Sequence, residues 1–480
     1  MAMGTRREHQ EDLWIPTCGL ARPASHPFYE RLNRLLGEHD FDRFVEGKCQ
    51  RFYAVSMGRP GLAPGIYFRL LLVGYFEGID SERGIAWRAG DSLSIRAFVG
   101  IPLEEGAPDH TTISRTRRLI DLATHRQVFA WVVEWLAEAG LVKGKRIGID
   151  ATTLEANAAL RSIVRRDNAE SYEDFLKGLA RESGIETPTR EDLARLDRKR
   201  KKKGSNEEWV NPHDPDARIT RMKDGRTHLA HKAEHAVDMD TGAVVAVTLQ
   251  EASLGDTTTV KETLAEAGAN VADLIEREAE TQPREKPQVN LGGIEEVVAD
   301  KGYHSGSVLE AMQAAGVRTY IPEKKQAGKR HWEGKEEQRR VVYANRQRLQ
   351  RPKGKRLLRK RGELIERTFA HCYDTGGMRR THLRKHNNIL KRLLIHVAAM
   401  NLGLLLRNAY GIGTPRGLQG LSLTMRLFVA MLVCCLNSEK GKLVRARVTS
   451  THVVPSYDHP ALCTHLSHRK IQKRTSTPDC

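Results

Sequence analysis

The sequence lacks the cysteine spacing of a zinc ribbon or of a disulfide framework. Its seven cysteines include no Cys-x-x-Cys pair, the spacing by which structural zinc sites are usually recognised. The N-terminal segment MAMGTRREHQEDLW has no apolar stretch, and a signal peptide requires one. The most apolar run, residues 427–436, is about half as long as a membrane-spanning helix. We therefore expect a cytoplasmic protein that has no membrane segment.

Acidic residues are too few to balance the basic ones. Lys and Arg total 78 against 60 Asp and Glu, which gives a formal net charge of +18 and a pI of about 9.6. An excess of this size is typical of proteins that bind a polyanion, and we expect that polyanion to be nucleic acid. The length of 480 residues suits two or three domains at about 150 residues each.

Apolar residues recur at every third or fourth position between residues 26 and 140, which predicts an all-α N-terminal domain. Within it, residues 108–120 (PDHTTISRTRRLI) predict a helix capped by Thr111 or Thr112. Its exposed face is expected to carry three arginines: Arg115, Arg117 and Arg118. The pattern suits a DNA-recognition helix, and it suits equally a core helix with a solvated basic face.

A second domain is predicted over residues 145–410. It begins with a β-type run from Arg146 to Ile149, and residues 160–227 form a highly charged insertion of exposed helix and loop. Two further β-type runs flank Asp240-Thr241-Gly242, which is a hairpin signal, and helix, strand, helix and strand follow. This order predicts an α/β domain with a mixed sheet. Residues 411–480 show no coherent pattern and are interpreted as a peripheral tail.

Three acids lie where acids are costly. Asp150 and Asp300 each follow a predicted strand, and Glu366 lies in an amphipathic helix. A carboxylate beside a core is unfavourable unless it is paired or bound to a cation. Two carboxylates on neighbouring strands and a third on a nearby helix can hold one or two Mg²⁺ ions, which promote in-line displacement at phosphorus. The acids therefore predict phosphodiester chemistry.

Basic residues surround these acids in the sequence. Residues 324–361 contain 16 Lys or Arg against 3 acids, and such a segment can hold a phosphate backbone. Within it we expect Lys353, Lys355 and Arg356 to bind DNA. Lys301 directly follows Asp300 and is either a phosphate contact or a solvated surface lysine.

Taken together, these motifs resemble the DDE transposases of bacterial insertion sequences. The resemblance rests on IGIDATTLEAN with Asp150, VVADKGYHS with Asp300 and RGELIERTFAH with Glu366. It extends to DPDAR at 214–218, to HKAEHAVDMDTG and to GGMRRTHLRKHNNILKRLL, and it spans about residues 26–410. It implies a ribonuclease H-like catalytic domain, in which a mixed five-stranded sheet is flanked by helices. It also implies that Asp150, Asp300 and Glu366 bind Mg²⁺, or Mn²⁺ in its place.

The resemblance also implies the partners. They are double-stranded DNA, as terminal inverted repeats and as target, and a second copy of the chain, because joining two DNA ends requires at least a dimer. The protein would then act in the bacterial cytoplasm, associated with the nucleoid. Related groups place an Arg and a Lys where this chain has Gly362 and Tyr373. The neighbouring basic residues expected to contact DNA instead are Arg361, Arg367 and Arg379.

HKAEH at 231–235 matches H-x-x-E-H, a zinc-protease motif that requires both histidines on one face of a helix. The alternation of small and polar residues and the nearby Gly242 favour a strand instead. A metal-dependent hydrolytic nuclease of the same fold remains an alternative. A DNA-binding regulator without catalysis is another, although buried carboxylates in its DNA-facing surface would repel phosphate.

Overall fold

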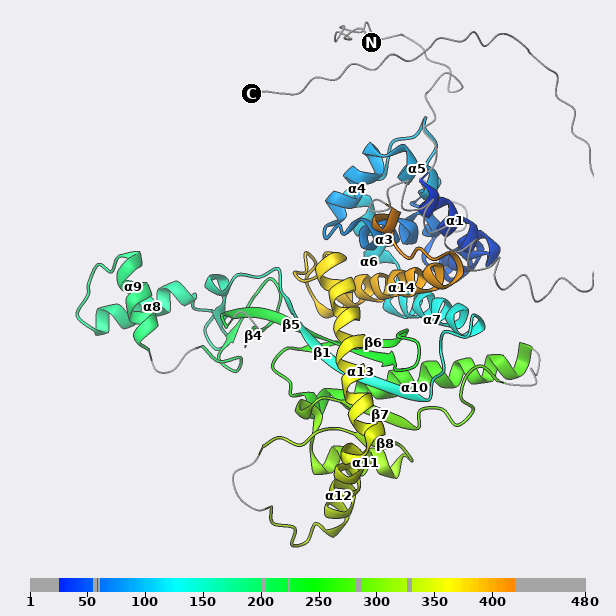
Figure 1. Ribbon diagram of the computed structural model, residues 1–480. Coiled ribbons are helices and arrows are strands. Elements are labelled where there is room, and N and C mark those ends of the chain that lie inside the picture. Colours follow the sequence, from blue (N-terminus) through cyan, green and yellow to red (C-terminus); the bar gives the residue numbers. More distant parts are fainter. Residues whose placement is uncertain are drawn as a thin grey trace, which may run out of the picture. The chain divides into compact units, whose positions relative to one another are not determined.

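The computed structural model describes residues 26–54, 58, 61–200, 204–222, 225–281, 287–325 and 330–418 (Figure 1). Most of the tail predicted at 411–480 therefore lies outside the described residues, as does the apolar run at 427–436. Two of the cysteines fall within the described residues, Cys49 and Cys372, and both are buried free thiols.

The N-terminal region is helical, as predicted. Its α-helices are α1 (Pro27–Glu38), α2 (Phe41–Cys49), α3 (Pro64–Glu77), α4 (Glu82–Asp91), α5 (Leu93–Val99), α6 (His110–Leu119) and α7 (Leu122–Glu138). Helix α3 is buried along most of its length. It begins at a proline, whose missing N–H costs nothing there, and ends at Gly78 in the left-handed conformation.

Helix α6 is capped two or three residues earlier than predicted. Asp109 is the capping residue, and its side chain accepts a hydrogen bond from the backbone N–H of Thr111 at 2.8 Å. The predicted caps, Thr111 and Thr112, therefore lie in the first turn of the helix. An aspartate is as good a cap as a threonine, and its charge also suits the positive end of the helix dipole.

A mixed sheet follows, which confirms the predicted fold class. Its strands are β1 (Arg146–Glu155), β4 (Arg218–Arg221), β5 (Thr227–Asp238), β6 (Val244–Glu251), β7 (Glu296–Ala299) and β8 (Arg318–Tyr320). Strand β1 pairs antiparallel with β5 and parallel with β7, and β7 pairs parallel with β8. The described sheet has six strands where five were expected. The additional strand is the short β4, which pairs with the first residues of β5 before β6 takes over the same edge.

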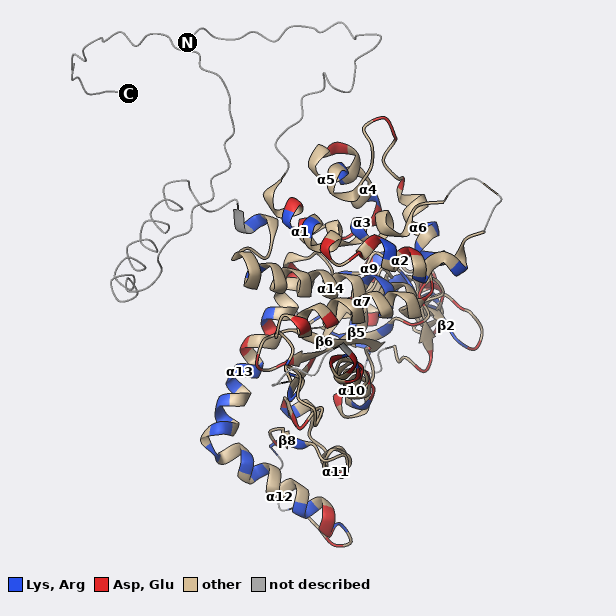
Figure 2. Cartoon of the chain, turned by 90° about the vertical axis from the view of Figure 1, so that its right-hand side faces the viewer, with Lys and Arg blue, Asp and Glu red and all other residues tan. Residues whose placement is uncertain are grey.

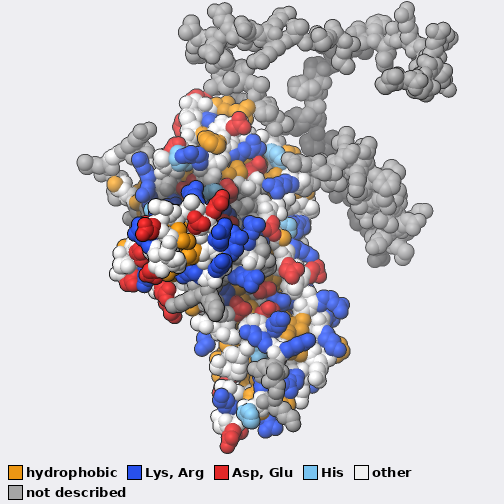
Figure 3. All heavy atoms as spheres, turned by 90° about the vertical axis from the view of Figure 1, so that its left-hand side faces the viewer, with side chains coloured by type: hydrophobic (Ala, Val, Ile, Leu, Met, Phe, Trp, Pro, Cys, Tyr) orange, Lys and Arg blue, Asp and Glu red, His pale blue; other side chains and the backbone are white. Residues whose placement is uncertain are grey.

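The insertion forms a small unit with its own core. It contains β2 (Val164–Arg165), β3 (Trp209–Val210), α8 (Tyr172–Glu182) and α9 (Arg190–Lys199). Leu176, Ala180 and Leu193 pack together between α8 and α9. Viewed from the α8–α9 side, the surface mixes basic and acidic side chains (Figure 3).

Helices cover both faces of the sheet. Side chains alternate along β5, so that Lys232 and Glu234 point to one face and His235 points to the other. Thr259 of α10 (Asp256–Thr281) contacts the first pair. Thr368 of α13 (Pro352–Phe369) contacts His235 on the opposite face. HKAEH therefore lies on a strand, as predicted, and lacks the helical geometry of the protease motif.

Helix α14 (His386–Tyr410) joins the two regions. It is long and apolar enough to cross a membrane, yet nearly all of it is buried inside the protein. It packs against α3, α7 and β6, and Asn401 hydrogen-bonds both the N–H and the C=O of Val244 in β6. One continuous hydrophobic core therefore runs from Phe28 in α1 to Leu406 in α14, which is the role of a core helix.

Candidate active site

Asp150 and Asp300 meet where two parallel strands part. The pairing of β1 with β7 ends at Ile149 and Ala299. Asp150 directly follows the first of these residues, and Asp300 directly follows the second. The prediction that this strand ends at Ile149 is wrong, because β5 continues to pair with β1 as far as Glu155. Asp150 thus lies inside β1 at the first position beyond its parallel partner. Carboxyl ends of neighbouring parallel strands are the usual site of ligands in α/β sheets.

Asp150 is largely buried and carries one strong cationic partner. Its Oδ2 accepts a hydrogen bond from Nη1 of Arg361 at 2.7 Å, and the two side chains are 24% and 16% exposed. Its Oδ1 accepts a hydrogen bond from the backbone N–H of Ala151. Burial raises the pKa of the Asp150 carboxyl; Arg361 opposes that rise, and the nearby charge of Asp300 adds to it. The site thus holds two interacting carboxylates and one guanidinium.

Asp300 is held by the turn that follows it. It caps the short helix η4 (Lys301–Tyr303), and its Oδ1 accepts a hydrogen bond from the backbone N–H of Gly302 at 2.6 Å. Lys301 is exposed, and Tyr303 is fully buried. The turn therefore fixes the carboxylate at the sheet edge while the chain leaves for α11 (Gly306–Ala314).

Glu366 lies on the helix that covers this edge but faces solvent. Arg361 and Ile365 of α13 point to β1, where Gly148 leaves space for the Ile365 side chain. Glu366 follows Ile365 by one residue, about 100° around the helix, and is exposed. Within the described ranges, no group of three or more His, Cys, Asp or Glu side chains is arranged to hold a metal ion. The structure brings Asp150 and Asp300 together and places Glu366 on the adjoining helix, outside that pair.

Several charged and polar residues behind the site were missed by the sequence analysis. Asp256 lies against the Asp300 turn, and Lys232 donates a hydrogen bond to its Oδ1 at 2.6 Å. Glu234 is fully buried and accepts a hydrogen bond from Tyr303. The signals were present in the sequence as a Lys and a Glu two residues apart in HKAEH, and as the tyrosine of ADKGY.

The predicted DNA-binding residues of α13 are mostly at the surface. Lys and Arg side chains follow one another along α13 and α12 (Glu336–Gln350) (Figure 2). Lys355 and Arg356 are exposed. Lys353 is also exposed, but its Nζ lies 2.5 Å from Oε1 of Glu296, which is fully buried. Lys353 therefore neutralises a buried acid as well as adding to the basic surface.

The N-terminal arginines separate into two kinds. Arg115 and Arg118 are exposed on α6, as predicted. The prediction for Arg117 is wrong: its side chain is buried, and its Nε lies 2.7 Å from Oε1 of Glu82 in α4. Its backbone oxygen accepts a hydrogen bond from Lys391 of α14. Arg117 ties three helices together and is not available to DNA.

The last two predicted DNA contacts have acidic neighbours. Nη2 of Arg367 lies 2.5 Å from Oε1 of Glu363, one turn earlier in α13. Arg379 lies 2.8 Å from Asp374 and donates a hydrogen bond to Thr152 of β1. Both side chains retain substantial exposure, 51% and 40%, and exposed pairs of this kind are weak enough to exchange partners.

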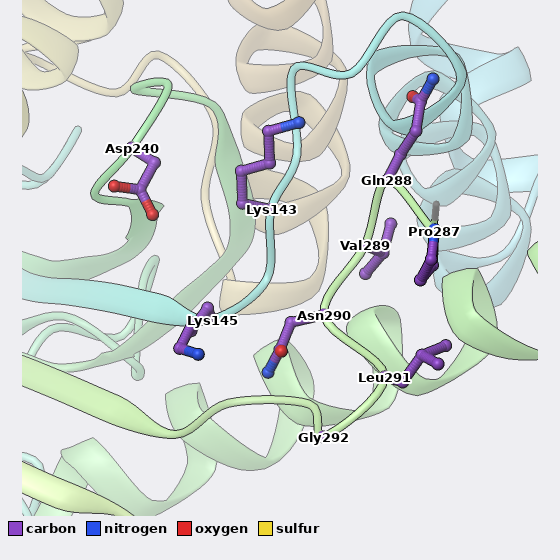
Figure 4. A pocket seen from close by; sticks show the side chains of 9 residues that line it. All are labelled: Lys143, Lys145, Asp240, Pro287, Gln288, Val289, Asn290, Leu291 and Gly292. Atoms are coloured by element: carbon purple, nitrogen blue, oxygen red, sulfur yellow. The ribbon is translucent and has the colours of Figure 1, made fainter. Parts of the chain in front are cut away.

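A hollow of about 460 Å³ (Figure 4) is lined by none of the three predicted catalytic acids. It is lined by Lys143, Lys145, Asp240 and residues 287–292, beside the first residue of β1. Asp150 is four residues further along that strand, so the hollow is not part of the acidic site.

Two stretches of the chain match known families. Residues 20–119 match the family described as "Transposase domain (DUF772)", and residues 208–402 match the one described as "Transposase DDE domain". The second match contains Asp300 and Glu366 and begins after Asp150. No solved structure matches the chain.

Proposed function

Since this chain belongs to the DDE transposases of insertion sequences, we propose that it cleaves DNA at the ends of its element and joins the freed 3′ ends to target DNA. The observation that carries the proposal is that the carboxylates of Asp150 and Asp300 interact directly beyond the last paired residues of β1 and β7. Two carboxylates brought this close are unfavourable without a cation between or beside them.

The carboxylate oxygens of this site are suitable ligands for Mg²⁺, and for Mn²⁺ in its place. Both carboxylates offer hard oxygen ligands, and Mg²⁺ commonly binds through one or two carboxylates while keeping several waters. The ion-pair contact of Arg361 with Asp150 is consistent with a position that favours positive charge. When bound, such ions activate an attacking oxygen and stabilise the leaving oxygen of a phosphodiester. Glu366, from the adjoining helix, is the third ligand in this proposal.

The remaining residues hold the substrate. Basic residues recur along α12 and α13 (Figure 2), and α13 also carries Arg361, which contacts Asp150. These two helices would hold the DNA backbone while the acids act on it. Lys301, which is exposed beside Asp300, would contact the reacting phosphate in this proposal. We propose that two copies of the chain act together, because two element ends must be joined, and that they do so on the bacterial chromosome.

The test is cleavage of DNA that carries the element's terminal inverted repeats. Asp150→Asn, Asp300→Asn and Glu366→Gln are each expected to lower Mg²⁺-dependent cleavage by at least about a hundredfold, since a metal ion supplies several kcal/mol of transition-state stabilisation. Binding of the same DNA without metal is expected to persist. Glu363→Gln, three residues earlier on α13 and also exposed, is the matched control and should cleave normally. Near-native cleavage by any of the three variants would remove that residue from the site.

A further inference from the structure

The turn that carries Asp300 is anchored to the buried side of the sheet. Tyr303, three residues after Asp300, donates a hydrogen bond from its hydroxyl to Oε1 of Glu234 at 2.7 Å. The same oxygen accepts a hydrogen bond from the hydroxyl of Thr259 at 3.0 Å, and Thr263 donates to Oε2. All four side chains are buried. The turn, β5 and α10 thus converge on one carboxylate.

A second contact holds the same turn from the side of α10. A Cβ on Gly302 would collide with the carboxylate oxygens of both Asp256 and Asp300, so the backbone of the turn lies directly against Asp256. Lys232 fixes Asp256 in turn, and its Nζ also donates a hydrogen bond to Thr259 at 2.9 Å. Lys232 and Glu234 are neighbours on one face of β5. The two contacts therefore share a strand and a threonine.

Packing alone does not require this arrangement. Glu234 is a fully buried carboxylate that accepts its hydrogen bonds from three hydroxyl groups. A buried acid is expensive, and apolar residues of similar volume commonly replace buried polar clusters without loss of stability. What such a cluster supplies is a defined geometry. Here the geometry that it defines is that of the three-residue turn beside Asp300.

We propose that Glu234 and Tyr303 are positioning residues of the catalytic site. They hold the turn after β7 so that the carboxylate of Asp300 faces that of Asp150, and neither touches the DNA or a metal ion. The inference rests on the proposed function, because it assigns a purpose to the orientation of Asp300. Residues that orient metal ligands typically influence metal affinity or activity by about ten- to a hundredfold.

The experiment measures Mn²⁺ affinity in the full-length protein, with free Mn²⁺ followed by electron paramagnetic resonance. Tyr303→Phe is expected to weaken Mn²⁺ binding about tenfold, because the turn loses its anchor. Glu234→Gln keeps an oxygen that can accept the Tyr303 hydrogen bond, and it should stay within about threefold of the wild type. Binding of DNA without metal should be the same in all of them.

Tyr67→Phe is the matched control. Tyr67 is also fully buried, and its hydroxyl lies 3.0 Å from Nε2 of His125 in the helical region. The substitution removes one buried hydrogen bond far from Asp300 along the fold. It should lower the melting temperature about as much as Tyr303→Phe does and leave Mn²⁺ affinity unchanged. Thr263→Val, which is nearly isosteric and removes a donor to Glu234, gives the same test if Tyr303→Phe fails to fold.

The possible failures are distinguishable. If Asp300→Asn weakens Mn²⁺ binding but Tyr303→Phe and Thr263→Val do not, the positioning role is wrong and the proposed function stands. If Asp300→Asn binds Mn²⁺ as the wild type does, Asp300 is not a ligand and both proposals are wrong. If Tyr67→Phe weakens Mn²⁺ binding as much as Tyr303→Phe does, the effect is a general loss of stability and the positioning role is again overturned.

Discussion

Asp150 and Arg361 form a pair whose two members have different proposed partners. Asp150 is assigned to metal and Arg361 to DNA, yet here Nη1 of Arg361 lies 2.7 Å from Oδ2 of Asp150. Nε of Arg361 is buried and has no hydrogen-bond partner among the described residues. The guanidinium of Arg361 repels a second cation at the same carboxylate, so we expect a divalent ion at Asp150 to compete with this contact.

Replacing Arg361 should therefore have two opposite effects. Arg361→Ala removes the competing cation, and Mn²⁺ affinity measured without DNA is expected to rise severalfold, since opposite charges within about 4 Å are strongly coupled at a partly buried site. DNA affinity is expected to fall, because one contact to phosphate is lost. Isothermal titration of each variant with Mn²⁺ measures the first effect.

Arg359→Ala is the control for this substitution. It removes the same charge from an exposed position two residues earlier on α13, so it should leave Mn²⁺ affinity unchanged. Equal Mn²⁺ affinities of the wild type and Arg361→Ala would show that Arg361 does not compete with metal.

At single residues, the sequence predicted chemical type better than partners. Asp150 and Asp300 were predicted as site residues because each follows an apolar run and the two occur in order with Glu366, and each run is visible in one short segment. Arg117 was assigned to DNA because the arginines of α6 look alike in sequence. Its actual partner, Glu82, is 35 residues away on α4, and no local pattern encodes a contact of that kind.

At the scale of elements, α13 connects the acidic site with the basic surface. The side of the helix that bears Arg361 and Ile365 packs on β1, whereas Lys355 and Arg356, in an earlier turn, face solvent. The helix begins at Pro352, directly after α12. The basic residues of α12 and α13 therefore lead along the chain into the part of α13 that carries Glu366.

This arrangement predicts how the salt dependence of DNA binding changes. Neutralising Lys355 and Arg356 together should make the slope of log affinity against log salt concentration less steep by about 2, because each phosphate contact contributes about 0.9. Titrations at several salt concentrations with fluorescently labelled DNA give the slope. An unchanged slope would exclude both residues from the interface.

Lys353 should behave differently from its neighbours. Glu296 would keep Arg146 and Tyr320 as partners after Lys353→Ala, but it would lose the close contact with the Lys353 ammonium. A buried acid deprived of a charged partner costs about 1–3 kcal/mol. Lys353→Ala should therefore lower the free energy of unfolding, whereas Lys355→Ala and Arg356→Ala should not.

The order of elements could be predicted, but the register of the strands could not. Alternation and turn residues indicated the β5–β6 hairpin around Asp240-Thr241-Gly242, and the structure has it there. The length of β1 depends on its pairing with β5 beyond Ile149, which is a tertiary contact. The contact of Glu234 with Tyr303 could not be predicted for the same reason. It depends on how β5, α10 and the turn after β7 pack together.

At the scale of the whole molecule, the core contains histidines that are held neutral. Burial lowers the pKa of His125 to about 4, and the pKa values of His235 and His396 to about 3. Nδ1 of His125 lies 2.7 Å from the carbonyl oxygen of Asp121 and donates to it, which leaves Nε2 to accept from Tyr67. These residues lie in α7, β5 and α14, so the effect extends across the core.

The free energy of unfolding should therefore fall in mild acid. In the unfolded chain these histidines take up a proton below about pH 6.5, whereas the folded protein resists protonation until pH 3 to 4. Stability is fully present above pH 6.5 and is lost as the pH falls below it, by up to about 1.4 kcal/mol per pH unit for each histidine. Urea denaturation at pH 7, 6 and 5 measures the change, and equal stability at all three would contradict neutral burial.

The most direct test of the whole account is strand transfer. Purified protein, Mg²⁺, DNA bearing the element's terminal repeat and a target plasmid are incubated together, and the products are separated on a denaturing gel. We predict that the 3′-ended strand of the repeat becomes joined to the plasmid, and that Asp300→Asn forms no joined product. Cleavage of the repeat by the wild type without any joining would indicate a hydrolytic nuclease, and joining by Asp300→Asn would contradict the assigned site.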